Sequence, residues 1–154
     1  MSVAEEQEEV EEYFGPRPDE ELLDVVRVEA GLGTSANIEL VHEMLHEGED
    51  VNQRSISGYT ALSVAAAAGA EQLVAILLEH RADVSPANVH RGERPLHHAA
   101  RMGHRVVSQL LAPACRDAGV IDVPNIMGCP PLHLAAMGAH TDVVTVLVRN
   151  NASP

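Results

Sequence analysis

The chain has 154 residues, of which 45% are hydrophobic and only 2% aromatic, and it carries a formal net charge of −13. This length suits one domain with an aliphatic core, and the negative charge argues against a general nucleic-acid or anionic-membrane binder, because those surfaces reward clustered cations. No apolar run approaches the roughly 20 residues of a membrane span, and the acidic start differs from a basic signal peptide. We therefore expect an intracellular protein, in the cytoplasm or alternatively in the nucleus.

The cysteines agree with this location. Cys115 and Cys129 are the only two in the chain, and no export signal accompanies them. Two free thiols are expected rather than a structural disulfide, because intracellular compartments are reducing.

Residues 1–24 form the most acidic stretch. They hold ten acidic side chains against a single basic one, Arg17. The segment Gly15-Pro16-Arg17-Pro18 interrupts any helix between this stretch and the rest of the chain. The charge and low apolar content predict a solvated, disordered tail over residues 1–18.

Residues 19–52 are expected to form a pair of helices. The first begins at Asp19 and has an apolar face that includes Leu22, Leu23, Val25 and Val26. Residues 31–35 interrupt it, and a second helix is predicted from about Asn37 to His46. Together they suggest a degenerate terminal repeat, whose outer face must tolerate water because nothing stacks on it.

Three related segments follow: 60–66 (TALSVAA), 94–100 (RPLHHAA) and 130–136 (PPLHLAA). Each follows a glycine by the same short interval, and the spacings are 34 residues from Gly58 to Gly92 and 36 from Gly92 to Gly128. Such self-similarity indicates a repeat protein. First helices are predicted from about residues 60, 95 and 131, and second helices from about residues 71, 104 and 141.

This pattern resembles the ankyrin-repeat family, whose unit of about 33 residues carries a T-P-L-H-x-A signature at the start of the first of two helices. Residues 69–84 fit the second helix and outgoing turn of that family without a gap. The resemblance covers roughly residues 37–154. Departures from the family pattern are Ala61, Ser63, Arg94, Pro130 and a stretched connection from Pro113 to Gly119.

The resemblance implies an all-α solenoid of stacked helical pairs joined by hairpin loops. We expect a capping repeat over residues 19–52 and three fuller repeats over about 53–85, 86–121 and 122–154. Leu62, Leu96 and Leu132 should be buried between neighbouring repeats.

One motif points instead to an enzyme. His42-Glu43-Met44-Leu45-His46 satisfies the H-E-x-x-H pattern, in which two histidines bind zinc and the glutamate acts as general base. A zinc-dependent hydrolase is therefore the alternative function. Such enzymes also need a third protein ligand and a cleft. The longer metzincin pattern, which extends H-E-x-x-H with a further glycine and histidine, is not satisfied here, because Gly48 and Asn52 fall where other spacing is required. We expect a surface helix whose two histidines face solvent, and we assign no metal ligands.

The remaining histidines and cysteines show no catalytic or ligand spacing. His97 and His133 occupy the histidine of the family signature, which implies structural hydrogen bonding between hairpins. His98, His104, His140 and the two cysteines lack the paired spacing of a metal site, and no glycine-rich phosphate loop is present. We therefore expect neither catalytic residues nor a cofactor.

The resemblance also implies where a partner binds. Proteins of this family grip partners with their hairpin tips and with the exposed side of their first helices, which line up as a concave surface. The corresponding residues here combine basic and soft apolar side chains. They are Arg54, Ile56, Tyr59, His90, Arg91, Glu93, Arg101, Met102, Ile126, Met127 and Met137.

The expected function is thus a monomeric protein-interaction module without chemistry of its own, acting as scaffold, adaptor or regulatory and inhibitory subunit. The surface predicts a protein partner with an acidic and partly apolar segment, and neither nucleic acid nor membrane. One rival interpretation is a partner bound on the convex side. A further hypothesis is that the acidic tail, with Tyr13 and Phe14, competes for the concave face as an internal mimic of the partner.

Overall fold

The structure is a computed structural model that describes residues 22, 23, 25, 26 and 38–154. The predicted tail over residues 1–18, the hypothesis that it masks the binding face, and the start of the first cap helix at Asp19 all concern residues outside the described part. Leu22, Leu23, Val25 and Val26 are helical, and three of these four side chains are buried, as the apolar face predicted.

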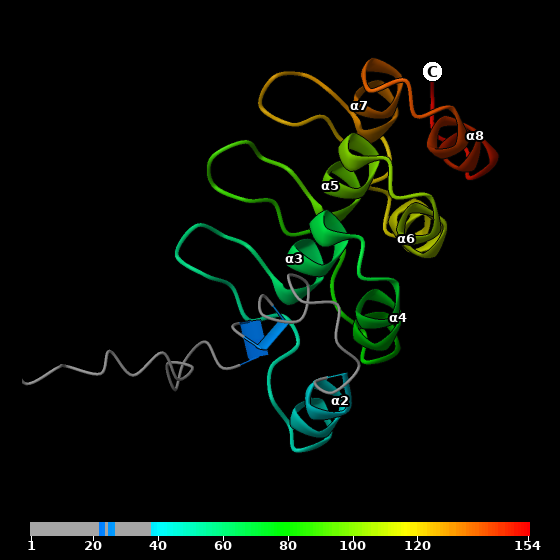
Figure 1. The fold of residues 1–154 in the computed structure, drawn as a ribbon. Helices are drawn as coiled ribbons and strands as arrows, with labels where there is room; N and C mark the ends of the chain where they lie inside the picture. Colours follow the sequence, from blue (N-terminus) through cyan, green and yellow to red (C-terminus); the bar gives the residue numbers. More distant parts are fainter. Residues whose placement is uncertain (1–21, 24, 27–37) are drawn as a thin grey trace, which may run out of the picture.

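The described residues include seven helices with defined bounds, arranged in two layers (Figure 1). The inner layer stacks α3 on α5 and α5 on α7, and the outer layer places α2, α4, α6 and α8 in succession beside it. Their bounds are α2 Ile38–His46, α3 Ala61–Ala68, α4 Glu71–Glu79, α5 Pro95–Met102, α6 Arg105–Asp117, α7 Pro131–Met137 and α8 Thr141–Arg149. Among the described helices, none is long and apolar enough to cross a membrane.

The starts of the inner helices follow from local sequence. Pro95 and Pro131 occupy the first helical positions, where the missing N–H is no loss. At the start of α3, Ser63 Oγ accepts from the Thr60 N–H at 2.8 Å while Thr60 Oγ1 accepts from the Ser63 N–H at 3.2 Å. Ser63 therefore performs a capping role although it departs from the family histidine.

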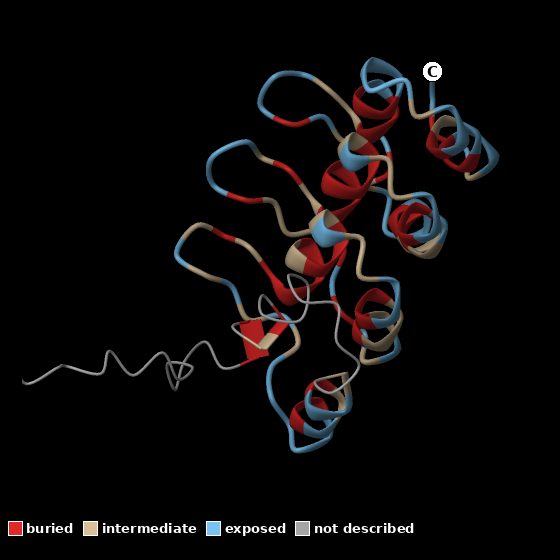
Figure 2. Cartoon of the chain, viewed as in Figure 1, coloured by how far each residue is buried: buried red, intermediate tan, exposed pale blue. Residues whose placement is uncertain are grey.

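The core lies between the two layers and between successive repeats (Figure 2). Leu62, Leu96 and Leu132 are 0%, 1% and 8% exposed, so all three are buried as predicted. Alanines next to these leucines are also fully buried, so adjacent inner helices approach closely through small side chains. The stack consequently holds its hairpin loops in a fixed series.

The connection from Pro113 to Gly119 differs from the sequence prediction. Instead of a stretched loop, α6 continues through Pro113 and ends at Asp117. Leu111 and Cys115, on either side of the proline, are both buried. Burial of this face outweighs the loss of one helical hydrogen bond, so the helix persists.

Candidate functional site

The three hairpin loops are tied directly to one another. The Val89 N–H donates to the Ser57 carbonyl at 2.9 Å, and the Ile126 N–H donates to the Arg91 carbonyl at 3.0 Å. Arg54 Nη2 also donates to the Ala87 carbonyl at 2.7 Å. Because each tip is hydrogen-bonded to the next, the row of tips behaves as one surface.

An asparagine braces each of the last two loops from inside. Asn88 Oδ1 accepts from the Arg91 N–H at 2.9 Å, and Asn125 Oδ1 accepts from the N–H groups of Met127 and Cys129 at 3.0 Å. Both asparagines are buried. A side-chain acceptor that satisfies backbone donors in this way holds a turn in one conformation.

The tips nevertheless present large apolar side chains to solvent (Figure 2). Ile56 is 92% exposed, Met127 is 77% and Ile126 is 68%. We call the exposed and half-buried side chains of the tips and of the ends of α5 and α7 the inner face. It comprises Arg54, Ile56, Tyr59, Val89, His90, Arg91, Arg101, Met102, Ile126, Met127 and Met137.

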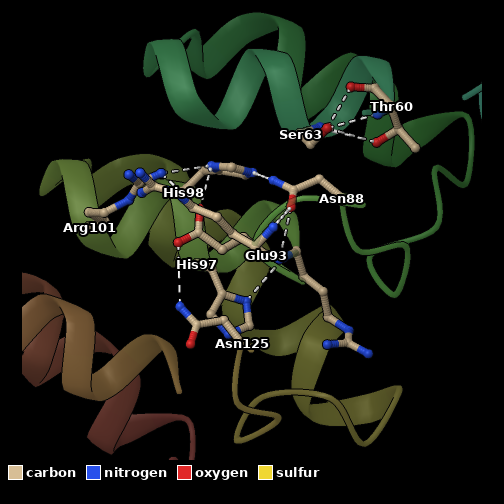
Figure 3. Close-up of polar contacts among 10 residues, drawn as sticks. Thr60, Ser63, Asn88, Glu93, His97, His98, Arg101 and Asn125 are labelled. Atoms are coloured by element: carbon tan, nitrogen blue, oxygen red, sulfur yellow. Dashed lines mark hydrogen bonds and ion pairs between the residues drawn. The ribbon is translucent and has the colours of Figure 1, made fainter. Parts of the chain in front are cut away.

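Glu93 does not belong to this face, and its prediction as a contact residue is wrong. It is only 2% exposed. Its carboxylate accepts from Arg101 Nη2 at 2.8 Å and from Asn125 Nδ2 at 3.4 Å, and lies 3.5 Å from His98 Nδ1 (Figure 3). Glu93 therefore links its hairpin to α5 and to the next loop. The ion pair with Glu93 neutralises much of the charge of Arg101. Arg54 and Arg91 are therefore the arginines of the inner face that have no carboxylate beside them among the described residues.

The paired histidines of α5 are interior residues. His97 Nδ1 accepts from the Arg94 N–H at 3.1 Å, the same role that Ser63 performs in α3 (Figure 3). Burial first, then the positive charge of Arg94, lowers the pKa of His97 from 6.5 to about 4. Burial also lowers the pKa of His98, although the carboxylate of Glu93 opposes the shift. Both rings are thus kept neutral and structural.

Two further histidines connect successive repeats. His104 Nε2 donates to the Ala67 carbonyl and His140 Nε2 to the Arg101 carbonyl, each at 3.0 Å. Cys115 and Cys129 are free thiols, and burial raises the pKa of Cys115 to about 12, which leaves it unreactive. His133, in contrast to His97, is exposed. His97, His98, His104 and His140 thus make structural contacts, as expected, whereas His133 does not lie in the interior.

The two histidines of the H-E-x-x-H pattern have a third neighbour that the pattern does not include. His42 and His46 lie on one side of α2, and His80 caps the end of α4. The ring centroids are 4.7 Å apart for His42 and His46, 5.4 Å for His42 and His80, and 5.5 Å for His46 and His80. One ligand nitrogen from each ring lies within 4.8 Å of the others, an arrangement that suits a metal ion. His42 is half-buried rather than fully solvent-facing, while Glu43 and His46 are exposed.

The last repeat also carries a groove of about 470 Å³. Leu132 and Ala136 of α7 and Val144 and Val148 of α8 line much of it. In the described part of the chain this side of the last repeat has no helix packed on it, which is why Val148 remains 50% exposed.

Comparison with known families agrees with the two-layer stack. A family model described as ankyrin repeats (3 copies) matches residues 32–122 and 84–154. The chain belongs to the ankyrin-repeat family. Ankyrin repeats are in general protein-interaction modules, so the inner face is the part of this ankyrin domain to consider as a binding surface.

Several curated proteins contain segments that are similar in sequence to this chain. The tyrosine-protein kinase HTK16 of Hydra vulgaris is 36% identical over 120 residues, which are 76% of this chain and 16% of that protein. The human ankyrin repeat domain-containing protein 63 is 34% identical over 108 residues (70% of this chain, 28% of that protein), and the mouse B-cell lymphoma 3 protein homolog is 31% identical over 103 residues (67% and 22%). The chain therefore spans less than a third of each of these relatives.

Sequence reasoning missed two features of the surface. Val89 is 68% exposed at the second tip. It lies in an irregular loop between buried Asn88 and exposed His90, where the sequence has no hydrophobic periodicity that would mark it. His80 was missed because it lies at the far end of another repeat from His42 and His46. Alignment of successive repeats would have found Val89, whereas His80 needed the packing of α2 on α4.

Proposed function

We propose that this ankyrin domain binds another protein through its inner face, as a scaffold, adaptor or regulatory subunit, and performs no catalysis itself. The observation that carries the proposal is the row of hydrogen-bonded tips with exposed apolar side chains. Large isoleucine, valine and methionine side chains that gather on one exposed face are typical of surfaces that bind other proteins.

The chemistry of the face suggests the class of partner. Ile56, Ile126 and Met127 offer apolar contact, and methionine can repack around differently shaped side chains. Arg91 is an exposed cation on a tip and is suited to a carboxylate. A partner segment with apolar residues flanked by acidic ones fits this combination. Arg101 contributes less than its sequence position suggests, because Glu93 already accepts from its guanidinium.

The ties between repeats support the same proposal energetically. The backbone bond from Val89 to Ser57 and the bond from Ile126 to Arg91 already order the tips in the free protein. Little conformational entropy then remains to be lost when a partner binds, so a modest contact area suffices. Surface residues can vary on such a frame without altering the fold, which is how one architecture serves different partners.

The test is affinity capture from the source cell with matched variants. Met127→Asp and Ile56→Asp place a charge on the inner face, and Val106→Asp places the same charge on α6, where Val106 is 39% exposed. We expect the two tip variants to lose the captured partner and Val106→Asp to keep it. Loss only in Val106→Asp would move the binding site to the outer helices.

Arg91→Glu tests the charge part of the proposal, with Arg105→Glu as its control. Both arginines are exposed, and Arg105 begins α6, where a glutamate suits the helix dipole. Arg91→Glu should weaken capture about tenfold and Arg105→Glu should not. Arg101→Glu is unsuitable because it would place a second carboxylate beside buried Glu93 and destabilise the domain itself.

The hydrolase alternative receives less support. Glu43 and His46 are exposed on the surface of α2, where bulk water competes with any substrate, and no element among the described residues encloses them. The three histidines are better explained as a binding site, which is a separate question from the inner face.

A further inference from the structure

We propose that His42, His46 and His80 form a site for a divalent transition-metal ion of the zinc class, which clamps α2 to α4. The site lies on the outer layer and goes beyond the protein-binding function proposed above. It would join the outermost described helix to the next repeat (Figure 1).

The ligand set is chemically suitable. Imidazole nitrogen binds zinc, copper and nickel well, and three histidines plus one water make a common four-coordinate arrangement for zinc. His42 and His46 are separated by one helical turn, so both rings project from the same side of α2. His80 approaches this pair from the end of α4, and the ring of His80 stands edge-on to both, at interplanar angles of 85° and 87°.

The distances allow a metal ion after a small adjustment. Zinc with ligand nitrogens at about 2.0–2.1 Å places those nitrogens roughly 3.3 Å apart in a tetrahedral site. The three candidate nitrogens already lie within 4.8 Å of one another. Since His42 and His80 are half-buried and His46 is exposed, rotation of side chains can close the remaining gap without moving either helix.

These histidines differ from the four that are hydrogen-bonded inside the stack. His97, His98, His104 and His140 each have a ring nitrogen within hydrogen-bonding distance of a protein group. Among the described residues, the rings of His42, His46 and His80 instead have one another as their recorded ring neighbours. Three imidazoles gathered in this way can each offer one nitrogen lone pair to a shared cation.

A metal clamp would act on the cap repeat. Terminal repeats of a solenoid contact only one neighbour and open more readily than central ones. Val41, Met44 and Leu45 bury one side of α2, and a metal ion bonded to His80 would add a link between α2 and α4. Metal that binds only the closed arrangement shifts the equilibrium toward the packed cap.

Titration of the full chain with Zn²⁺ by calorimetry tests the proposal, and Co²⁺ absorption reports the coordination number. We expect one ion per chain in the wild type. His42→Ala and His80→Gln should each weaken binding by about 100-fold or more, since each removes a direct ligand and changes outside the coordination shell already cost roughly 10–100-fold. His133→Ala and Cys129→Ser remove other potential ligands elsewhere and should leave the affinity unchanged.

The role of His80 is decided by hydrogen exchange of the amides in the last turn of α4, which His80 follows. Zn²⁺ should slow exchange there in the wild type and not in His80→Gln, because the two α2 histidines alone cannot bridge to α4. If His80→Gln binds Zn²⁺ as tightly as the wild type, or if Cys129→Ser abolishes binding, the three-histidine clamp is wrong. Wild-type stoichiometry well below one ion per chain would also overturn it.

Discussion

The second and third fuller repeats carry nearly the same helix-initiating sequence, yet the two copies have different environments. His97 is fully buried in α5, whereas His133 at the same position of α7 is exposed. Glu93 is buried one residue after its tip glycine, and Cys129 at the equivalent place is only half-buried. The middle repeat is packed on both sides and the last one, within the described chain, on one. A repeat motif thus specifies how a helix begins, and the neighbouring repeats decide which of its polar residues become interior.

The largest expected effect concerns Glu93. Glu93→Ala should lower the free energy of unfolding by about 3 kcal/mol, because it removes a buried carboxylate that accepts from half-buried Arg101 and buried Asn125. Cys129→Ala, the matched change in the last repeat, should cost less than about 0.5 kcal/mol. Urea unfolding followed by circular dichroism measures both. If the two variants lose the same unfolding free energy, the position after the tip glycine is not more deeply integrated in the middle repeat than in the last one.

Acid sensitivity should separate the two signature histidines. The folded-state pKa of His97 is about 4, below its unfolded value of 6.5, so protonation favours the unfolded chain. Its contribution to stability is complete above pH 6.5 and is lost progressively as the pH falls toward 4. Between about pH 7 and pH 5 this amounts to roughly 2 kcal/mol.

The variants His97→Gln and His133→Gln isolate that contribution. His97→Gln should flatten the dependence of the unfolding free energy on pH by that amount, even though it also lowers stability at neutral pH. His133→Gln, which removes an exposed ring, should keep the wild-type slope. A slope that is unchanged in His97→Gln would assign the acid sensitivity to other groups, of which His98, whose pKa burial also lowers, is the first candidate.

The sequence was sufficient for the fold because the fold depends on local signals. Pro95 and Pro131 mark helix starts, and the spacing of Gly58, Gly92 and Gly128 marks the repeat length. Ile56, Ile126 and Met127, which are exposed at the tips, followed from the same register, whereas Val89 did not. Whether these residues bind a partner stays a prediction.

The errors arose where contacts between distant residues outweigh local preference. Glu93 looks exposed from its loop, but its partners are Arg101, eight positions on, and Asn125, 32 positions on. Pro113 favours a helix end locally, yet burial of Leu111 and Cys115 keeps α6 intact. The meeting of His80 with His42 and His46 depends on how α2 packs on α4, which no motif within one repeat encodes.

The last comparison concerns the ends of the inner helices. Gly103 ends α5 with φ of +75°, and a Cβ added there would lie 2.5 Å from the ring of His140. That ring cannot move away without breaking its hydrogen bond to the Arg101 carbonyl. Gly103→Ala should therefore cost about 2 kcal/mol, through both the backbone conformation and the contact.

The last repeat supplies the reverse experiment. Ala139 takes the place of Gly103 and is already held at φ of +56°, a conformation that glycine adopts without strain. Ala139→Gly should stabilise the domain by roughly 0.5–1 kcal/mol, because the relief of strain exceeds the added freedom of the unfolded chain. Thermal unfolding of Gly103→Ala, of Ala139→Gly and of the double variant measures these changes. We expect a lower melting temperature for the first and a higher one for the second. If Ala139→Gly instead destabilises the domain, the packing of the Ala139 methyl group contributes more to stability than its backbone strain costs.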